Sequence, residues 1–166
     1  MSVLLLAVLL AQAGWSAFTA ADGKASVAAP CVLVVDPAPP PPKKPGDRLM
    51  ATSFFSCTTP AKDEYYFIAW VDYDPAFELD TAAELKANRD NTIKAISGAT
   101  LLTSADATYQ GNPALDFTAN VQGRFRVTSR VVMAGRRPYQ IAAMTPLDKD
   151  RSEAVRRFLD SLSIKN

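Results

Sequence analysis

The second half of the chain alternates apolar and polar residues with the two-residue period of a β-strand. From Thr100 onward, four such stretches follow one another: TLLTSADATY, NPALDFTANV, RFRVTSRVVM and PYQIAAMT. Short breaks at Gly111, Gly123 and Gly135 separate them. Alternating strands joined by short glycine-containing turns are typical of antiparallel hairpins. The pattern therefore predicts a four-stranded antiparallel meander.

The length of the turn between the second and third of these stretches determines how they pair. A two-residue loop would pair Val121 with Arg124 and put the two apolar rows on opposite faces of the sheet. One additional residue pairs Val121 with Phe125, and both apolar rows then share a face. This register also predicts complementary cross-strand pairs on the polar face, namely Asp116 with Arg130 and Asn120 with Arg126.

Three earlier segments also have strand-like sequences. The stretch from Trp15 to Ala29 contains a turn at Asp22-Gly23 between two short extended segments, which predicts a hairpin. Residues 49–57 (LMATSFFSC) and 65–73 (YYFIAWVDY) are rich in aromatic and β-branched residues. The second of them has few polar positions, and we expect a central strand that is covered on both faces.

The segment between these strands and the meander predicts a helix. Thr81 and Glu84 form the capping box TAAE, in which the threonine hydroxyl accepts a hydrogen bond from the backbone N–H of Glu84. Apolar residues recur after it at near-helical spacing, and Gly98 provides a stop signal. We expect a helix from about Ala82 to Ser97.

The C-terminal stretch LDKDRSEAVRRFLDSLSI predicts a second helix, with Asp150 or Ser152 as its N-cap. Its apolar residues form a stripe with charges elsewhere, so we expect this helix to dock on the sheet. The stripe consists of Ala154, Val155, Phe158, Leu159 and Leu162.

The N-terminal residues predict export. Val3 to Leu10 is an unbroken apolar run, and the small-residue pattern Ala11-Gln12-Ala13 follows it. These features predict a signal peptide over residues 1–13 that is cleaved after Ala13. A short membrane anchor or a buried strand is the alternative, but the run is too short to cross a bilayer as a helix. We therefore expect a secreted or periplasmic protein without a stable membrane anchor after cleavage, a single domain over residues 14–166, and an exposed proline-rich loop at residues 36–47.

Cys31 and Cys57 are the only two cysteines. An exported chain lies in an oxidising compartment, where an even number of cysteines is compatible with a disulfide. A bridge between them would close a loop around the proline-rich segment. Two separate buried thiols are the alternative, because cysteine also behaves as a small apolar residue. The sequence leaves both interpretations open.

Composition narrows the chemistry. The formal net charge is +1 and the chain contains no histidine. The near-neutral charge argues against general binding to nucleic acid. The absence of histidine removes imidazole metal ligands and Ser-His or Cys-His nucleophile systems. No phosphate-binding loop, dinucleotide fingerprint or nucleophile-elbow motif is present. We therefore expect no cofactor, no metal site and no catalytic residue.

Two groups of charged residues are weak site candidates. Arg136 and Arg137 lie in the last predicted turn of the meander. We interpret them as the solvated tip of a hairpin, and contact with an anion or a partner is the alternative. Four carboxylates cluster at the end of residues 65–73 and in the loop that follows. We interpret them as exposed loop acids, although paired carboxylates could also perform acid–base chemistry. They are Asp72, Asp74, Glu78 and Asp80.

The order of these elements resembles a known group of domains. The segments that carry the resemblance are WSAFTAADGKASVAAP, GNPALDFTA, VQGRFRVTSRVVMAGRRPYQIAAMTP and AVRRFLDSLSI. They are similar to exported bacterial domains with a PsbP-like fold, a group named after an extrinsic photosystem subunit. The resemblance implies an α+β fold, in which helices pack on an antiparallel β-sheet as an α/β/α sandwich.

Members of that group generally act as accessory or binding modules. The resemblance therefore implies a non-catalytic extracytoplasmic module whose partner is an unidentified protein or a small apolar ligand. A carboxylate-based hydrolase of unknown substrate is the alternative function. Fold by itself does not establish either function.

Overall fold

The computed structural model of the protein describes residues 14–36 and 49–165. The predicted signal peptide lies outside the described residues. So does the predicted proline-rich loop, apart from Asp36.

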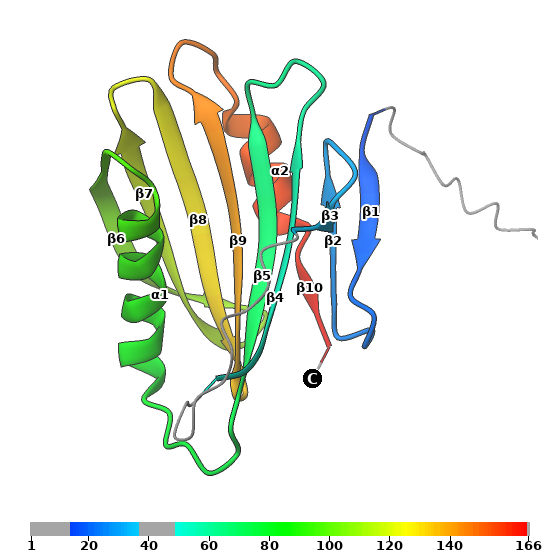
Figure 1. The fold of residues 1–166 in the computed structure, drawn as a ribbon, viewed down its shortest axis with the longest axis vertical. Coiled ribbons are helices and arrows are strands. Elements are labelled where there is room, and N and C mark those ends of the chain that lie inside the picture. The colour runs from blue at the N-terminus through cyan, green and yellow to red at the C-terminus, as the bar shows by residue number, and fades with distance from the viewer. Residues whose placement is uncertain (1–13, 37–48, 166) are drawn as a thin grey trace, which may run out of the picture.

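A seven-stranded antiparallel sheet forms the centre of the molecule (Figure 1). Its strands lie in the order β3-β4-β5-β9-β8-β7-β6, so the predicted meander forms one half of the sheet. The bounds of these strands are β3 Val34–Val35, β4 Leu49–Thr58, β5 Tyr65–Tyr73, β6 Ala99–Tyr109, β7 Asn112–Val121, β8 Phe125–Ala134 and β9 Arg137–Pro146.

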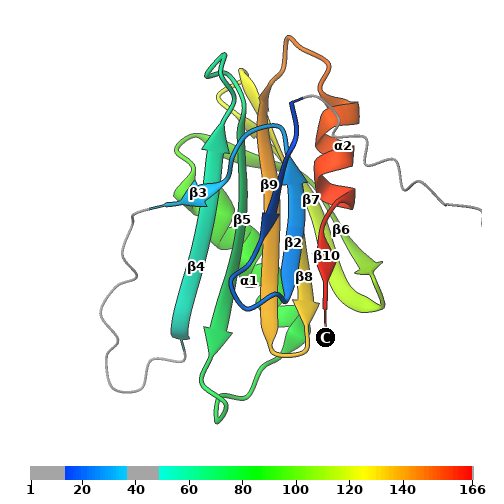
Figure 2. The same cartoon turned by 90° about the vertical axis from the view of Figure 1, so that its right-hand side faces the viewer.

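The two faces of this sheet are covered by different elements. Helix α1 (Thr81–Ala95) packs on the meander strands from one side. A small sheet and helix α2 (Ser152–Asp160) lie side by side on the other face (Figure 2). The small sheet has the order β1-β2-β10. Its strands are β1 Ser16–Thr19, β2 Ala25–Ala29 and β10 Ser163–Ile164.

Strand alternation divides the core into two parts. Leu115 and Val131 point toward α1 and belong to the cluster that contains Leu85 of that helix. Tyr66 and Ile141 point to the other face, where they join Phe158 of α2 in the largest cluster. Neighbouring residues of a strand project to opposite faces, so one sheet can supply both clusters. The α+β fold class with helices packed on an antiparallel sheet is thereby confirmed.

The predicted register of the meander is confirmed. Val121 pairs with Phe125, and the loop between β7 and β8 has the one additional residue that this pairing requires. Asp116 lies opposite Arg130, and Asn120 lies opposite Arg126. The register puts the arginines of β8 on the face that carries α2, because the apolar residues between them face α1.

Helix α1 confirms the predicted element but corrects its cap. Asp80, not Thr81, is the N-cap, and its carboxylate accepts a hydrogen bond from the backbone N–H of Ala83 at 3.0 Å. The carboxylate of Glu84 accepts a hydrogen bond from the hydroxyl of Tyr73. The capping-box pattern therefore predicted the start of the helix to within one residue, but it assigned the N-cap role to Thr81 instead of Asp80.

Helix α2 docks on the sheet as predicted. Val155, Phe158 and Leu159 are buried, and Phe158 contacts the ring of Tyr66 edge-on at 5.0 Å between centroids. Its N-cap position is Arg151, which makes no side-chain capping bond. The carboxylate of Asp150 instead accepts from the backbone N–H of Ser152 at 3.0 Å.

Cys31 and Cys57 form a disulfide in the structure, and the alternative of two separate thiols is wrong. Their Cα atoms are 5.8 Å apart. Cys31 follows β2 of the small sheet, and Cys57 lies in β4 of the large sheet. The bridge therefore fastens the two sheets together.

Candidate functional site

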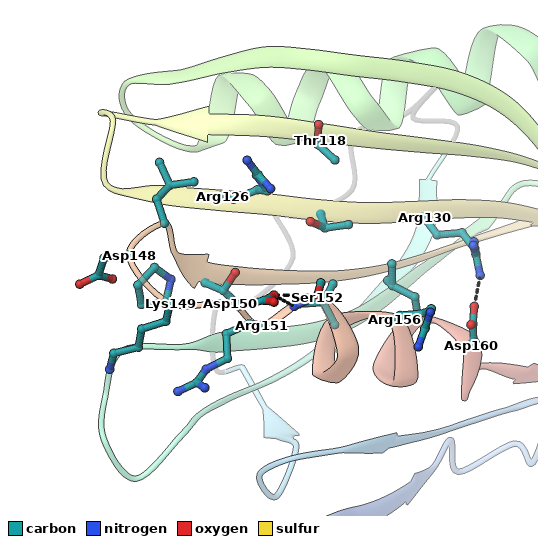
Figure 3. Close-up of a pocket in the computed structure, with 16 residues that line it drawn as sticks. Thr118, Arg126, Arg130, Asp148, Lys149, Asp150, Arg151, Ser152, Arg156 and Asp160 are labelled. Carbon is teal, nitrogen blue, oxygen red and sulfur yellow. Dashed lines mark hydrogen bonds and ion pairs between the residues drawn. The ribbon is translucent and has the colours of Figure 1, made fainter.

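An open groove lies between the large sheet and α2, and Figure 3 shows the residues that line it. Its volume is about 510 Å³. Polar residues of β7, β8 and β9 form one wall, and α2 with the segment before it forms the other. The strand wall includes Thr118, Arg126, Thr128, Arg130 and Thr145.

The groove has a polar lining because alternate residues of its strands point to opposite faces of the sheet. On β8 the residues that alternate with these polar positions, such as Val127 and Val131, are buried against α1. Helix α2 has nine residues and covers only part of the opposite face with its apolar stripe. The polar side chains of β7 and β8 beyond that stripe therefore line a concave surface that solvent reaches.

Arg130 is the most constrained cation of the groove. Its guanidinium binds Asp116 with two hydrogen bonds, Nε to Oδ1 at 2.9 Å and the second at 3.0 Å. It also reaches Asp160 of α2 at 3.2 Å and lies over the ring of Tyr109 at 4.5 Å. The hydrogen bonds to Asp116 raise the pKa of Arg130 above its ordinary value. Arg130 therefore joins β6, β7 and α2, and its charge is matched by two carboxylates.

The segment that precedes α2 is held by two further ion pairs. Lys149 binds Asp63, and Arg151 binds Glu64, both across to the turn before β5. Glu64 is buried and also accepts a hydrogen bond from the hydroxyl of Tyr66 at 2.6 Å. These contacts fix the position of the groove wall with respect to the sheet.

Arg126 and Arg156 differ from the other cations of the groove. Both are exposed, and neither guanidinium has an ion pair within residues 14–36 and 49–165. Arg126 comes from the strand wall and Arg156 from the helix wall (Figure 3). Two uncompensated positive charges therefore line one concave surface of a chain whose net charge is only +1.

The structure places Arg136 and Arg137 elsewhere, in a network of structural contacts. The side chain of Arg137 is only 19% exposed, and it binds Asp22 of the first hairpin and Asp72 of β5. Arg136 donates to the backbone carbonyls of Asp74 and Phe77. The interpretation of this pair as a solvated hairpin tip is wrong for Arg137, because folding brings distant carboxylates to it.

The predicted carboxylate group is distributed among separate structural contacts. Asp72 pairs with Arg137, while Asp74 accepts from the backbone N–H of Ala76 at 2.8 Å in the following turn. Asp80 caps α1. Each of these three carboxylates has its own partner, so they do not converge on a shared substrate position.

The Arg137 network leads to a prediction about pH. The hydrogen bond from Arg137 lowers the pKa of Asp22. A carboxylate whose pKa is lowered by folding stabilises the protein above its unfolded pKa of about 4, and this contribution is lost as the pH falls through the folded value. We expect Arg137→Met to reduce the loss of thermal stability between about pH 6 and pH 3. Melting temperatures measured across this range would test the prediction.

Lys86→Met provides the control for this experiment, because Lys86 is exposed on α1, away from the Arg137 network. We expect it to keep the acid sensitivity of the unmodified protein. A melting profile of Arg137→Met that runs parallel to that of the unmodified protein would contradict the role assigned to Asp22.

The groove residues were only partly visible in the sequence. The strand register identified Arg126 and Arg130 as members of one polar face but assigned them to cross-strand pairs. Arg156 was missed, since it is one of several charged residues on the polar side of α2. Val155 and Leu159 also line the groove. Arg156 lies next to Val155 and three positions before Leu159, so its place on the helix could have indicated that it borders the same surface.

Comparison with known proteins supports the fold. No family model matches the sequence, and no curated protein matches it. The solution structure of PsbP from the cyanobacterium Synechocystis sp. PCC 6803 (CyanoP) is similar, with a TM-score of 0.62, 13% identity, and coverage of 94% of this chain and 95% of that one. The crystal structure of PA94 from Pseudomonas aeruginosa, a protein of unknown function, has a TM-score of 0.50, 12% identity, and coverage of 81% and 98%.

The protein therefore has a PsbP-like fold, as the resemblance implied. At these identities the likeness concerns the fold and does not assign an activity. Within the described part of the chain, no helix has the length and apolar character needed to cross a membrane.

Proposed function

We propose that the protein is a non-catalytic extracytoplasmic binding module whose binding surface is the groove between the large sheet and α2. The observation that carries this proposal is the pair of guanidiniums of Arg126 and Arg156, which have no ion pair among the described residues, on a concave surface whose other cations are all ion-paired. Ligand sites are commonly preformed concave surfaces with a few convergent polar groups. Here the ion pairs of Arg130 and Arg151 supply the rigidity that such a site needs.

Eight described side chains have pKa values that are shifted away from the range that acid–base catalysis needs. Hydrogen bonds to their carboxylates lower the pKa values of Asp22, Asp63, Asp90 and Asp150. Burial raises the pKa values of Tyr65, Tyr66, Tyr109 and Tyr139. An efficient general acid or base has a pKa near the operating pH, and these shifts lead away from neutrality.

The disulfide supports the extracytoplasmic part of the proposal. Disulfides persist in secreted and periplasmic proteins and are rare in the cytosol. The bridge joins two sheets of one domain and so has a structural role. The fold supports an accessory role only by analogy, through its likeness to CyanoP.

The proposal is tested by producing the full chain in a bacterium with a periplasm and isolating it under native conditions. We expect a mature protein that begins at Gly14, contains the intact disulfide, and carries a bound molecule or partner in native mass spectrometry. Full-length protein in the cytoplasm with two alkylatable thiols would contradict export. Recovery of the mature protein with nothing bound, under several growth conditions, would contradict the binding role.

A second arm tests the absence of catalysis. Generic ester, phosphate and glycoside substrates are expected to show no turnover. Turnover that is lost in Asp72→Asn or Asp74→Asn would instead support the carboxylate-based hydrolase. We prefer the binding module because Asp72 is held by Arg137 and Asp74 by a local turn.

A further inference from the structure

The chemistry of the groove restricts the class of ligand, provided that the proposed binding function holds. Its charged residues divide into those with partners and those without. Arg130, Lys149 and Arg151 each pair with at least one carboxylate. Among the described residues, the groove cations without an ion pair are Arg126 on β8 and Arg156 on α2.

The acidic residues of the groove do not neutralise this pair of arginines. Asp160 is bound to Arg130, and the carboxylate of Asp150 accepts from the backbone and hydroxyl of Ser152. Asp148 lies beside Lys149 at the end of the groove that is nearer to Arg126 than to Arg156 (Figure 3), and no ion pair joins it to Arg126 among the described residues. The middle of the groove therefore attracts anions.

Neutral hydrogen-bonding groups accompany the two arginines. Thr118, Thr128 and Thr145 come from three neighbouring strands and line the same wall as Arg126. The hydroxyl of Thr118 is 2.7 Å from that of Thr103 on β6. Threonine hydroxyls donate and accept hydrogen bonds, so they suit a polar ligand better than an apolar one.

The size of the groove favours a small molecule. Its volume of about 510 Å³ falls within the range of small-molecule sites. Guanidinium groups bind carboxylate and phosphate oxygens with paired hydrogen bonds. An arginine on each of two opposing walls can engage two separate acidic groups of one molecule.

We propose that the groove binds a small organic dianion, with one acidic group on Arg126 and the other on Arg156. This assignment differs from the small apolar ligand that the resemblance to PsbP-like domains implied. Carboxylate and phosphate groups share the chemistry that the two arginines recognise, and the experiment distinguishes between them.

The test is isothermal titration calorimetry of the full mature protein at low ionic strength, with two probes that each have two acidic groups. Succinate has two carboxylates, and 2-carboxyethylphosphonate has a phosphonate, which stands in for phosphate, in place of one of them. We expect saturable one-to-one binding of at least one probe, and no heat of binding for neutral erythritol. The probe that binds more tightly identifies the preferred acidic group.

The variants Arg126→Gln and Arg156→Gln are each expected to weaken binding about tenfold or more, because each removes a charge-assisted hydrogen bond. Both residues are exposed and have no ion pair with any residue that the structure describes, so the melting temperatures of the two variants should remain that of the unmodified protein. Lys86→Gln, on the opposite face of the sheet, removes the same charge and is expected to leave the affinity unchanged.

Absence of saturable binding of both probes up to millimolar concentration would overturn the dianion assignment. Equal weakening by Lys86→Gln and the groove variants would also overturn it, because the effect would then be one of net charge. If the native isolation nevertheless recovers a stoichiometric protein partner or a neutral molecule, the binding function stands and only the ligand class is wrong.

Discussion

Replacement of both bridged cysteines, Cys31→Ser together with Cys57→Ser, is expected to lower the free energy of unfolding by about 3–4 kcal/mol. The two residues are 26 positions apart, and their bridge closes this loop in the unfolded chain as well as in the native one. Opening the loop increases the entropy of the unfolded state, which favours unfolding. A small domain is typically stable by about 5–15 kcal/mol, so this loss is a large fraction of the total.

Urea denaturation of the oxidised protein and the double variant measures this difference. Reduction of the unmodified protein should reproduce the loss, whereas the same reductant should leave the double variant unchanged. A difference below about 1 kcal/mol would show that the loop is already restricted without the bridge. In that case the contact between the two sheets would depend on apolar packing alone.

Truncation of Phe158 to alanine is expected to destabilise the protein by about 3–5 kcal/mol. Its side chain is fully buried and lies between α2 and the large sheet, where it contacts Tyr66. The substitution removes apolar contacts and leaves a cavity that the two sheets and the helix cannot easily fill. The effect is large because the same cluster includes residues of both sheets and of α2.

Arg156→Ala is the matched control for Phe158→Ala, because it lies two positions earlier on the exposed side of α2. We expect its effect on the unfolding free energy to stay within about 0.5 kcal/mol. Chemical denaturation monitored by far-UV circular dichroism would compare the two variants. Equal stability of the two would contradict the docking of α2 on the sheet.

The paired strands of the meander could be predicted because their determinants are local. Apolar residues at every second position specify which face is buried, and the loop length between β7 and β8 then fixes the register in which Val121 meets Phe125. The helix starts were less certain. Asp80 and Thr81 are both good N-cap residues, and the backbone conformation at one position decides between them.

The candidate site could be predicted only on its strand side. The register places Arg126 and Arg130 on the polar face of the sheet, but it pairs Arg126 with Asn120 and gives no indication of a groove. The groove exists because α2 packs beside these strands and contributes Arg156. The docking position of a helix depends on how its apolar stripe fits residues far away in the sequence, which a local pattern does not contain.

The contacts of Arg137 could not be predicted from the residues around it in the sequence. Its sequence neighbours are typical of a turn, and a turn residue is usually solvated. Its partners Asp22 and Asp72 lie 115 and 65 positions away, and folding brings both to the start of β9. No signal in the surrounding sequence identifies them as partners.

The sequence by itself determined the α+β class, the strands of the meander and their register, and the amphipathic character of α2, because side-chain periodicity reports directly on which face is buried. The tertiary structure decided the Cys31–Cys57 bridge, the network around Arg137, and the groove that Arg126 and Arg156 line. These features depend on the distance between residues of different elements, and that distance is set by the packing of the two sheets and α2 around one core.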